Sequence, residues 1–219
     1  MIKLISFDMD KTLVKSIYAE LVWLEGLPKI YALEKKIDLE KAKQFLLEKY
    51  DEIGEYREEW YDIEYWFKCF NLKYNWVELL EKYRFAIETY SEVTNVLRRL
   101  YKKFELIITS NARREFIEVE LRETKLRKYF THVFSSTSDF HMVKKVTEFY
   151  SMICDKMNIH PDEMIHIGDH EEFDYNIPKK FGITSFHLDR EKRNQGDFVV
   201  YDLKEFEERI NKLTSSQKI

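Results

Sequence analysis

The stretch KLISFDMDKTLV, residues 3–14, opens with a short apolar segment, Lys3–Phe7, and then becomes acidic at Asp8. Short apolar segments bounded by polar turn residues predict buried strands. Five more follow: Phe104–Thr109, His132–Ser135, Met164–Ile167, Ile183–His187 and Phe198–Tyr201. Amphipathic stretches long enough for helices lie between most of them: Val93–Lys102, Arg113–Leu126, Val143–Met157, Phe173–Phe181 and Leu203–Leu213. This alternation predicts an α/β protein, a parallel sheet with helices on both faces.

One region breaks the alternation of strands and helices. From about Lys15 to Tyr90, apolar residues recur at helical spacing and no strand is evident. The region holds all 4 tryptophans and 17 of the 34 aromatic residues, enough for a small core of its own. We expect a core of residues 1–14 and 91–219 and an all-helical insert of residues 15–90, placed after the first strand. The polar tail, Thr214–Ile219, is expected to fray.

The composition excludes several classes of protein. With 44% hydrophobic residues, 35% charged residues, 5 Gly and 3 Pro, the chain is neither disordered nor collagenous. The net charge of −4 provides no basic field, so we expect no nucleic acid or membrane partner. No segment predicts a signal peptide or a membrane span, which favours a cytoplasmic protein. Cys69 and Cys154 form no metal-binding or disulfide pattern.

The residues that follow the predicted strands form a candidate site, because open parallel sheets bind ligands at the carboxyl ends of their strands. After the first, second and fourth strands come, in order, Asp8, Asp10 and Thr12; Ser110 and Asn111; and Asp169 and Asp174. Four carboxylates at one edge repel each other unless a cation or protons compensate their charge. Oxygen ligands without His or Cys favour Mg²⁺.

Mg²⁺ in proteins usually binds a phosphate group, and a bound phosphate also needs hydrogen-bond donors. The Ser110 hydroxyl and the Asn111 backbone N–H, at a predicted helix start, supply two of them and the helix dipole. A fixed positive charge is also required. Either Lys144 or Lys145, at the start of the helix after the third strand, can provide it.

Four sequence motifs resemble those of the haloacid dehalogenase superfamily. They are DMDKTLV at Asp8–Val14, IITSN at Ile107–Asn111, a lysine near 144, and HIGDHEEFD at His166–Asp174. Their order and placement at strand ends match as well. The resemblance implies a Rossmann-like core, and the helical insert lies where the helical-cap members of the superfamily carry their cap.

The resemblance also implies roles for the individual residues. Asp8 is the expected nucleophile and a metal ligand, and Asp10 the general acid and base, which binds Mg²⁺ through its carbonyl. Asp169 completes the expected metal site. Thr12, Ser110, Asn111 and Lys144 are the expected phosphate-binding residues, and Lys144 also offsets the charge of the nucleophile. Asp174 is expected either to bind the metal through water or to orient Lys144.

Some of these assignments rest on choices between neighbours. Counting back 25 residues from Asp169 gives Lys144 the usual register of the family, so Lys145 is expected to face solvent and replaces a frequent Pro. Ser110 is preferred over Thr109, which points the other way on a strand. Alternatively, Asp174 only caps the next helix, with Pro178 near its first turn.

The function expected from this resemblance is a Mg²⁺-dependent phosphomonoester hydrolase acting on a small phosphorylated metabolite. Alternatives are a 2-haloacid dehalogenase, disfavoured by Asp10, a phosphomutase, and a non-catalytic binding protein, disfavoured by the retained Asp8 and Asp169. Sugar phosphates, phosphoglycolate and nucleotides remain open as substrates, and the chain is a monomer or a homodimer. Aromatic residues of the insert, such as Tyr61, are expected mainly in its core, and Arg113 on a solvated face.

Overall fold

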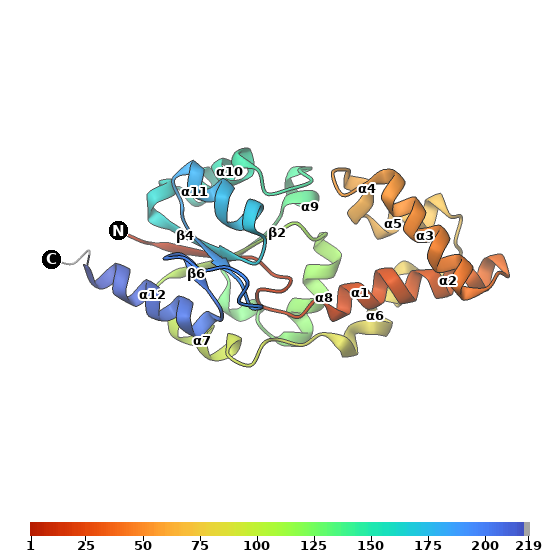
Figure 1. The fold of residues 1–219 in the computed structure, drawn as a ribbon, viewed down its shortest axis with the longest axis horizontal. Coiled ribbons are helices and arrows are strands. Elements are labelled where there is room, and N and C mark those ends of the chain that lie inside the picture. Colours follow the sequence, from red (N-terminus) through yellow and green to blue (C-terminus); the bar gives the residue numbers. More distant parts are fainter. Residues whose placement is uncertain (217–219) are drawn as a thin grey trace.

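The computed structural model describes residues 1–216 and contains one six-stranded sheet in that range. Its strands are β1 (Leu4–Phe7), β2 (Glu105–Ser110), β3 (His132–Ser135), β4 (Met164–Gly168), β5 (Thr184–Leu188) and β6 (Val199–Val200). All neighbours pair in parallel, in the order β3-β2-β1-β4-β5-β6. The predicted α/β fold is therefore confirmed, and β1, which carries the first acidic motif, lies in the middle of the sheet (Figure 1).

Helices cover both faces of the sheet, because side chains alternate between its faces along each strand. Ile5 and Phe7 point to one face, and Leu4 to the other. The first face packs against α7 (Val93–Leu100), α8 (Arg114–Thr124) and α12 (Leu203–Ser216). The second packs against α10 (Thr147–Met157) and α11 (Ile177–Phe181), which lie on the opposite side of the sheet in Figure 1. Shorter elements complete this part: α9 (Ser136–Phe140), the 3-10 turns η3 (Arg127–Tyr129) and η4 (Pro161–Glu163), and the π-helical turn η5 (Glu171–Asn176).

The region between β1 and α7 is helical, as expected. Its elements are α1 (Ile17–Glu20), η1 (Leu21–Gly26), α2 (Leu27–Lys35), α3 (Leu39–Ile53), α4 (Glu58–Tyr61), α5 (Ile63–Cys69), α6 (Trp76–Tyr83) and η2 (Arg84–Ala86). They enclose a hydrophobic cluster of their own that includes Trp66. Phe116 and Val119 of α8 also belong to this cluster, so the insert packs on α8. The exact division at residues 15 and 90 stays a prediction.

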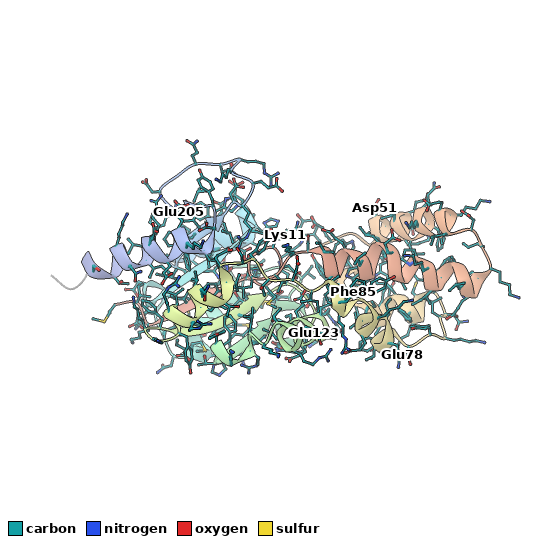
Figure 2. The ribbon with its side chains drawn as sticks, turned by 90° about the horizontal axis from the view of Figure 1, so that it is seen from below. Lys11, Asp51, Glu78, Phe85, Glu123 and Glu205 are labelled. Atoms are coloured by element: carbon teal, nitrogen blue, oxygen red, sulfur yellow. The ribbon has the colours of Figure 1, made fainter. Side chains whose placement is uncertain are left out.

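The two segments that join the helical insert to the sheet run side by side. Val14 and Thr89 form an antiparallel bridge, and the Lys15 N–H donates to the Glu88 carbonyl at 2.9 Å. The molecule is elongated, and the junction lies near its middle. In Figure 2, Lys11 lies near the junction, and Asp51 and Glu205 lie toward opposite ends of the molecule. Both connections therefore leave the sheet beside the first acidic motif.

Two boundaries differ from the sequence-based predictions. The helix predicted over Val143–Met157 begins only at Thr147. The final helix continues to Ser216, so the part of the tail from Thr214 to Ser216 is helical, and residues 217–219 lie outside the described residues. Within residues 1–216, the structure contains no helix with the length and apolar character that a membrane crossing requires.

Candidate active site

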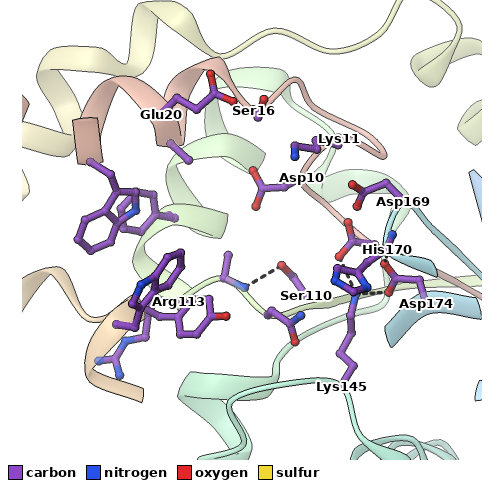
Figure 3. A pocket seen from close by; sticks show the side chains of 18 of the residues that line it. Asp10, Lys11, Ser16, Glu20, Ser110, Arg113, Lys145, Asp169, His170 and Asp174 are labelled. Carbon is purple, nitrogen blue, oxygen red and sulfur yellow. Dashed lines mark hydrogen bonds and ion pairs between the residues drawn. The ribbon is translucent and has the colours of Figure 1, made fainter. Parts of the chain in front are cut away.

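Acidic side chains meet at the carboxyl edge of the sheet. Asp8 follows β1, Asp169 follows β4, and Asp174 lies on η5. One carboxylate oxygen from each of these three residues lies within 4.8 Å of the others. Figure 3 shows Asp10 facing the same space, together with Ser110 at the end of β2. The structure thus brings together the predicted acidic residues and the predicted phosphate-binding serine.

Asp8 is buried and held at both oxygens. The Thr12 hydroxyl donates to Asp8 Oδ2 at 3.2 Å, and the Lys145 ammonium donates to Asp8 Oδ1 at 2.7 Å. Burial raises the pKa of Asp8, as do the neighbouring carboxylates Asp174 and Asp169, while Lys145 opposes this shift. Thr12 therefore contacts the expected nucleophile, and Lys145 supplies the positive charge beside it.

The lysine at the site is Lys145, and the expectation that it faces solvent is wrong. Lys145 is fully buried between Asp8 and Asp174, and these two carboxylates raise its pKa although burial alone would lower it. Lys144 points away from this cluster and pairs with Glu55 of the insert at 2.9 Å. The prediction placed both lysines in a helix, but that helix starts at Thr147. In the irregular segment before it, the two side chains diverge.

Lys145 contacts a buried hydrogen-bond network that lies within the sheet. Asp174 Oδ1 contacts Lys145 and, at 3.0 Å, His166 Nε2. His166 Nδ1 meets the Ser6 hydroxyl at 3.0 Å, and Ser6 meets the Thr109 hydroxyl at 2.7 Å. The network therefore crosses three neighbouring strands beneath the site. Sequence reasoning missed Ser6 and His166, although polar residues at alternating positions of otherwise apolar strands were a usable signal.

Both carboxylate oxygens of Asp174 make contacts in this network. Its second oxygen, Oδ2, accepts the backbone N–H of His170 at 3.1 Å. Although burial opposes it, Lys145 and His166 lower the pKa of Asp174. Gly168 makes the close approach feasible, because a Cβ at that position would lie 2.3 Å from Asp174 Cγ. These contacts favour the expectation that Asp174 orients a lysine, and that lysine is Lys145. The alternative that Asp174 caps the helix with Pro178 in its first turn is wrong, because Asp174 lies within η5 and the N-cap of α11 is Asn176.

Ser110 and Asn111 are arranged as donors. Ser110 Oγ accepts the Ala112 N–H at 3.1 Å, which leaves its hydroxyl proton free for a ligand. Asn111 Oδ1 accepts from the Ser136 hydroxyl at 3.0 Å, so its amide NH₂ is the group left to donate. Helix α8 begins only at Arg114, three residues after Asn111, and the Arg114 N–H donates to Ser138. Asn111 therefore stands in the loop before the helix, not in its first turn.

Asp10 lies against a second buried carboxyl group, Glu120 of α8. Burial raises the pKa of Asp10 to about 6 and holds the pKa of Glu120 well above its usual range. The Asp10 charge further favours neutral Glu120, and Asp10 Oδ1 and Glu120 Oε2 are both buried without a hydrogen-bond partner among residues 1–216. Glu120 was missed by the sequence reasoning, yet it falls on the apolar face of α8, three residues after Ile117 and one before Leu121.

The site opens into a cavity of about 440 Å³ between the sheet edge and the helical insert. Aromatic residues of the insert and of α8 line the side away from the acidic cluster: Trp23, Tyr50, Trp60, Tyr61 and Phe116. Tyr61 therefore borders the cavity, as does Arg113, whose guanidinium pairs with Asp62 at 3.2 Å and Glu115 at 3.3 Å. In Figure 3, Arg113 lies at the opposite side of the cavity from Asp169 and Asp174.

The acidic residues present fit a magnesium ion. Every donor atom in the group of Asp8, Asp169 and Asp174 is a carboxylate oxygen, the ligand type that Mg²⁺ prefers. Burial, with a smaller contribution from the Asp174 charge, raises the pKa of Asp169 to about 6, so its ionised form is disfavoured at this edge. A divalent cation would offset that charge. Since Asp174 is committed to Lys145 and His166, Asp8 and Asp169 are the side chains best placed to ligate.

The chain is similar to known proteins in both sequence and structure. The family model for haloacid dehalogenase-like hydrolases matches residues 5–188. A search of curated protein sequences found no match.

Solved structures with the same fold include two with different activities in their descriptions. A HAD phosphatase from Thermococcus onnurineus has a TM-score of 0.82 and 22% identity, over 95% of this chain and 98% of its own. A 2-haloacid dehalogenase from Pseudomonas syringae has a TM-score of 0.70 and 18% identity, over 97% and 100%. The HAD-hydrolase YfnB from Bacillus subtilis, described as bound to magnesium, has a TM-score of 0.67 and 16% identity, over 96% and 99%.

Proposed function

Because the chain belongs to the haloacid dehalogenase-like hydrolase family, we propose that it is a Mg²⁺-dependent phosphomonoester hydrolase. It acts on a small phosphorylated metabolite through an aspartyl-phosphate on Asp8. The observation that carries this proposal is Asp10, a carboxyl group two residues after the nucleophile that faces the same cavity. Its pKa, raised by burial to about 6, suits a group that gives and takes a proton near neutral pH.

The residues of the site divide the reaction between them. An Asp8 oxygen attacks phosphorus, and the bond from phosphorus to the ester oxygen breaks. Asp10 gives its proton to the departing alkoxide, and then takes a proton from the water that hydrolyses the phosphorylated Asp8. The hydroxyl of Ser110 and the amide of Asn111 donate to phosphoryl oxygens, and Lys145 offsets the charge on Asp8.

Mg²⁺ would be held by Asp8 and Asp169, with the Asp10 carbonyl as the ligand that the family resemblance implies. When bound, it supplies charge neutralisation that lets anionic phosphate approach an anionic nucleophile. Asp174 then acts on Lys145, whose position between Asp174 and Asp8 keeps the ammonium at the nucleophile.

The dehalogenase alternative makes a different use of the same nucleophile. A 2-haloacid dehalogenase attacks carbon and releases halide in its first step, so the leaving group of that step needs no proton. Asp10, which faces the cavity with a pKa raised by burial to about 6, would have no leaving group to protonate in that first step. This difference favours phosphoryl transfer.

The test is phosphate release from 4-nitrophenyl phosphate, with Mg²⁺ and with EDTA, by the wild type and Asp8→Asn. We expect metal-dependent release that falls by at least about a thousandfold in the variant, because an amide cannot act as the nucleophile. Asp51→Asn, an exposed residue of α3, is the matched control and keeps full activity. Near wild-type release by Asp8→Asn would refute the mechanism. Halide release from 2-chloropropionate without phosphate release would establish the alternative.

A further inference from the structure

The cavity has two chemically different sides. The sheet edge contributes the acidic residues, Ser110 and Asn111, where the phosphoryl group is expected. The opposite side is built from rings that come from separate elements: Trp23 of η1, Tyr50 of α3, Trp60 and Tyr61 of α4, and Phe116 of α8. We call these five residues the aromatic wall. A leaving group attached to the phosphate would extend from the first side toward this wall.

The rings of the aromatic wall are ordered by contacts with each other. Trp23 and Phe116 stack with centroids 5.6 Å apart and planes at 11°. Tyr50 meets Trp23 edge-on at 6.0 Å, and Trp60 meets Tyr61 at 4.8 Å. Stiff side chains that are already in place lose little conformational entropy when a flat ligand packs against them.

The charges around the cavity disfavour a second anionic group on the substrate. Among the described residues that line the cavity, Arg113 is the basic residue on the side away from the acidic cluster, and Asp62 and Glu115 neutralise it. Lys145 is committed to Asp8 and Asp174, and Lys11 lies beside Asp10 and Asp169 (Figure 3). Glu20 adds a negative charge to the cavity lining.

We propose that the substrate class is phosphate monoesters whose leaving alcohol carries a planar, uncharged ring that packs against the aromatic wall. The volume of about 440 Å³ accommodates a phosphoryl group with one or two fused rings. Aromatic ligands gain stacking energy on such rings beyond the burial of apolar area. Phosphoglycolate, which carries a second anion, and open-chain polyol phosphates, which have no ring face, are poor substrates. This inference rests on the proposed phosphohydrolase function.

The experiment compares esters that differ in ring planarity but not in leaving-group chemistry. Benzyl phosphate and cyclohexylmethyl phosphate both release a primary alcohol of similar size, so their intrinsic reactivities are similar. Glycerol 3-phosphate and 2-phosphoglycolate represent polyol and doubly anionic substrates, and acetyl phosphate tests phosphoryl transfer without a bulky leaving group. We expect kcat/KM for benzyl phosphate to exceed that for cyclohexylmethyl phosphate by about tenfold, and to exceed the other two monoesters by more.

Substitutions in the aromatic wall identify where the preference arises. In Trp60→Leu and Trp23→Leu, the benzyl to cyclohexylmethyl ratio of kcat/KM is expected to fall toward one. Trp76→Leu removes a tryptophan of α6 that lies outside the lining of this cavity, and it keeps the wild-type ratio. Because each ratio is measured within one variant, a general loss of folded enzyme cancels.

The outcomes separate this inference from the proposed function. Release of phosphate from neither 4-nitrophenyl phosphate nor any of the five compounds overturns the proposed function and this inference with it. Release from 4-nitrophenyl phosphate or acetyl phosphate but not from benzyl phosphate overturns the substrate class alone. Release with no preference for benzyl over cyclohexylmethyl phosphate, or with glycerol 3-phosphate or 2-phosphoglycolate preferred, overturns the substrate class and leaves the hydrolase standing. A benzyl preference that both wall variants retain overturns the role of the aromatic wall.

Discussion

Two adjacent lysines have opposite surroundings. Lys145 is enclosed with Asp8 and Asp174, whereas Lys144 lies outside this cluster, against Glu55 and the rings of Tyr56, Tyr61 and Phe173. An ammonium between two buried carboxylates stabilises both in their ionised form. Lys145 is therefore the lysine whose charge acts on the reacting groups.

We predict that Lys145→Met lowers kcat by about a hundredfold or more, the loss typical when a fixed electrostatic contact to the reacting groups is removed. Lys144→Met is the matched control, with the same substitution one residue earlier, and it lowers kcat by less than about tenfold. Steady-state kinetics with 4-nitrophenyl phosphate provides the measurement, and circular dichroism confirms folding. Equal losses in the two variants, or a larger loss in Lys144→Met, would contradict the assignment.

Glu120 is a buried acid whose ionisation opposes folding. Burial and Asp10 raise its pKa well above the usual value of 4.5 in the folded chain, while the unfolded chain keeps that ordinary value. Between these two values the folded state binds the extra proton, so the free energy of unfolding decreases as pH rises. The slope is at most about 1.4 kcal/mol per pH unit.

We predict that Glu120→Gln unfolds at a higher temperature than the wild type, with a difference that increases from pH 5 to pH 8. Glutamine stays neutral and keeps a donor for Asp10, so it avoids the cost of ionisation. Thermal unfolding followed by circular dichroism in EDTA measures the difference. Glu118→Gln, on the exposed side of the same helix, changes stability by less than about 0.5 kcal/mol at each pH. A variant that is less stable than the wild type at pH 8 would exclude this account.

Among the elements, the segment from Gly54 to Asp62 is the part of the helical insert that contacts residues beside the sheet edge. It contains α4 and carries Trp60 and Tyr61 of the aromatic wall. Ion pairs hold it at both ends, from Glu55 to Lys144 at 2.9 Å and from Asp62 to Arg113 at 3.2 Å. Lys144 also lies 5.5 Å from the centre of the Tyr61 ring. These contacts keep one section of the aromatic wall in place over the cavity.

We predict that Glu55→Gln raises KM for a phosphate ester up to about fivefold, because a partly exposed ion pair contributes at most about 1 kcal/mol to holding the segment. The value of kcat changes less than about twofold, since Glu55 does not touch the reacting groups. Glu52→Gln removes the exposed pair with Lys49, 2.6 Å apart, and serves as the control with unchanged KM. A fall in kcat with unchanged KM would show that the segment acts on chemistry instead.

Across the whole molecule, the sheet and its order of elements followed from the sequence, because apolar segments that alternate with amphipathic ones are a strong local pattern. The convergence of Asp8, Asp10, Ser110 and Asp169 followed as well, since residues after parallel strands must meet at one edge. What the pattern could not supply was the direction of individual side chains in irregular backbone. Lys144 was chosen by the family's usual spacing from Asp169 and was expected in a helix, but the helix begins three residues after it.

The other functional residues that the sequence did not predict have a feature in common. Glu120 and His166 are polar groups on buried faces, stabilised by partners from other elements: Asp10 for Glu120, and Ser6 and Asp174 for His166. A local pattern marks such residues as exceptions but does not name their partners, which lie far away in the chain. The aromatic wall is similar, since its rings come from four elements that meet only in the folded molecule.

The paired connections at Val14 and Thr89 bear on how such proteins diversify. Because the chain enters and leaves the insert at adjacent points, a deletion or exchange of that region needs only a short turn to restore continuity, and β1 and α7 keep their places. Recombination can therefore replace the part that bears most of the aromatic wall while the reacting carboxylates are inherited intact. The region that selects the substrate and the region that carries the reacting groups can therefore be inherited separately. A chimera of two such proteins should be joined at this junction.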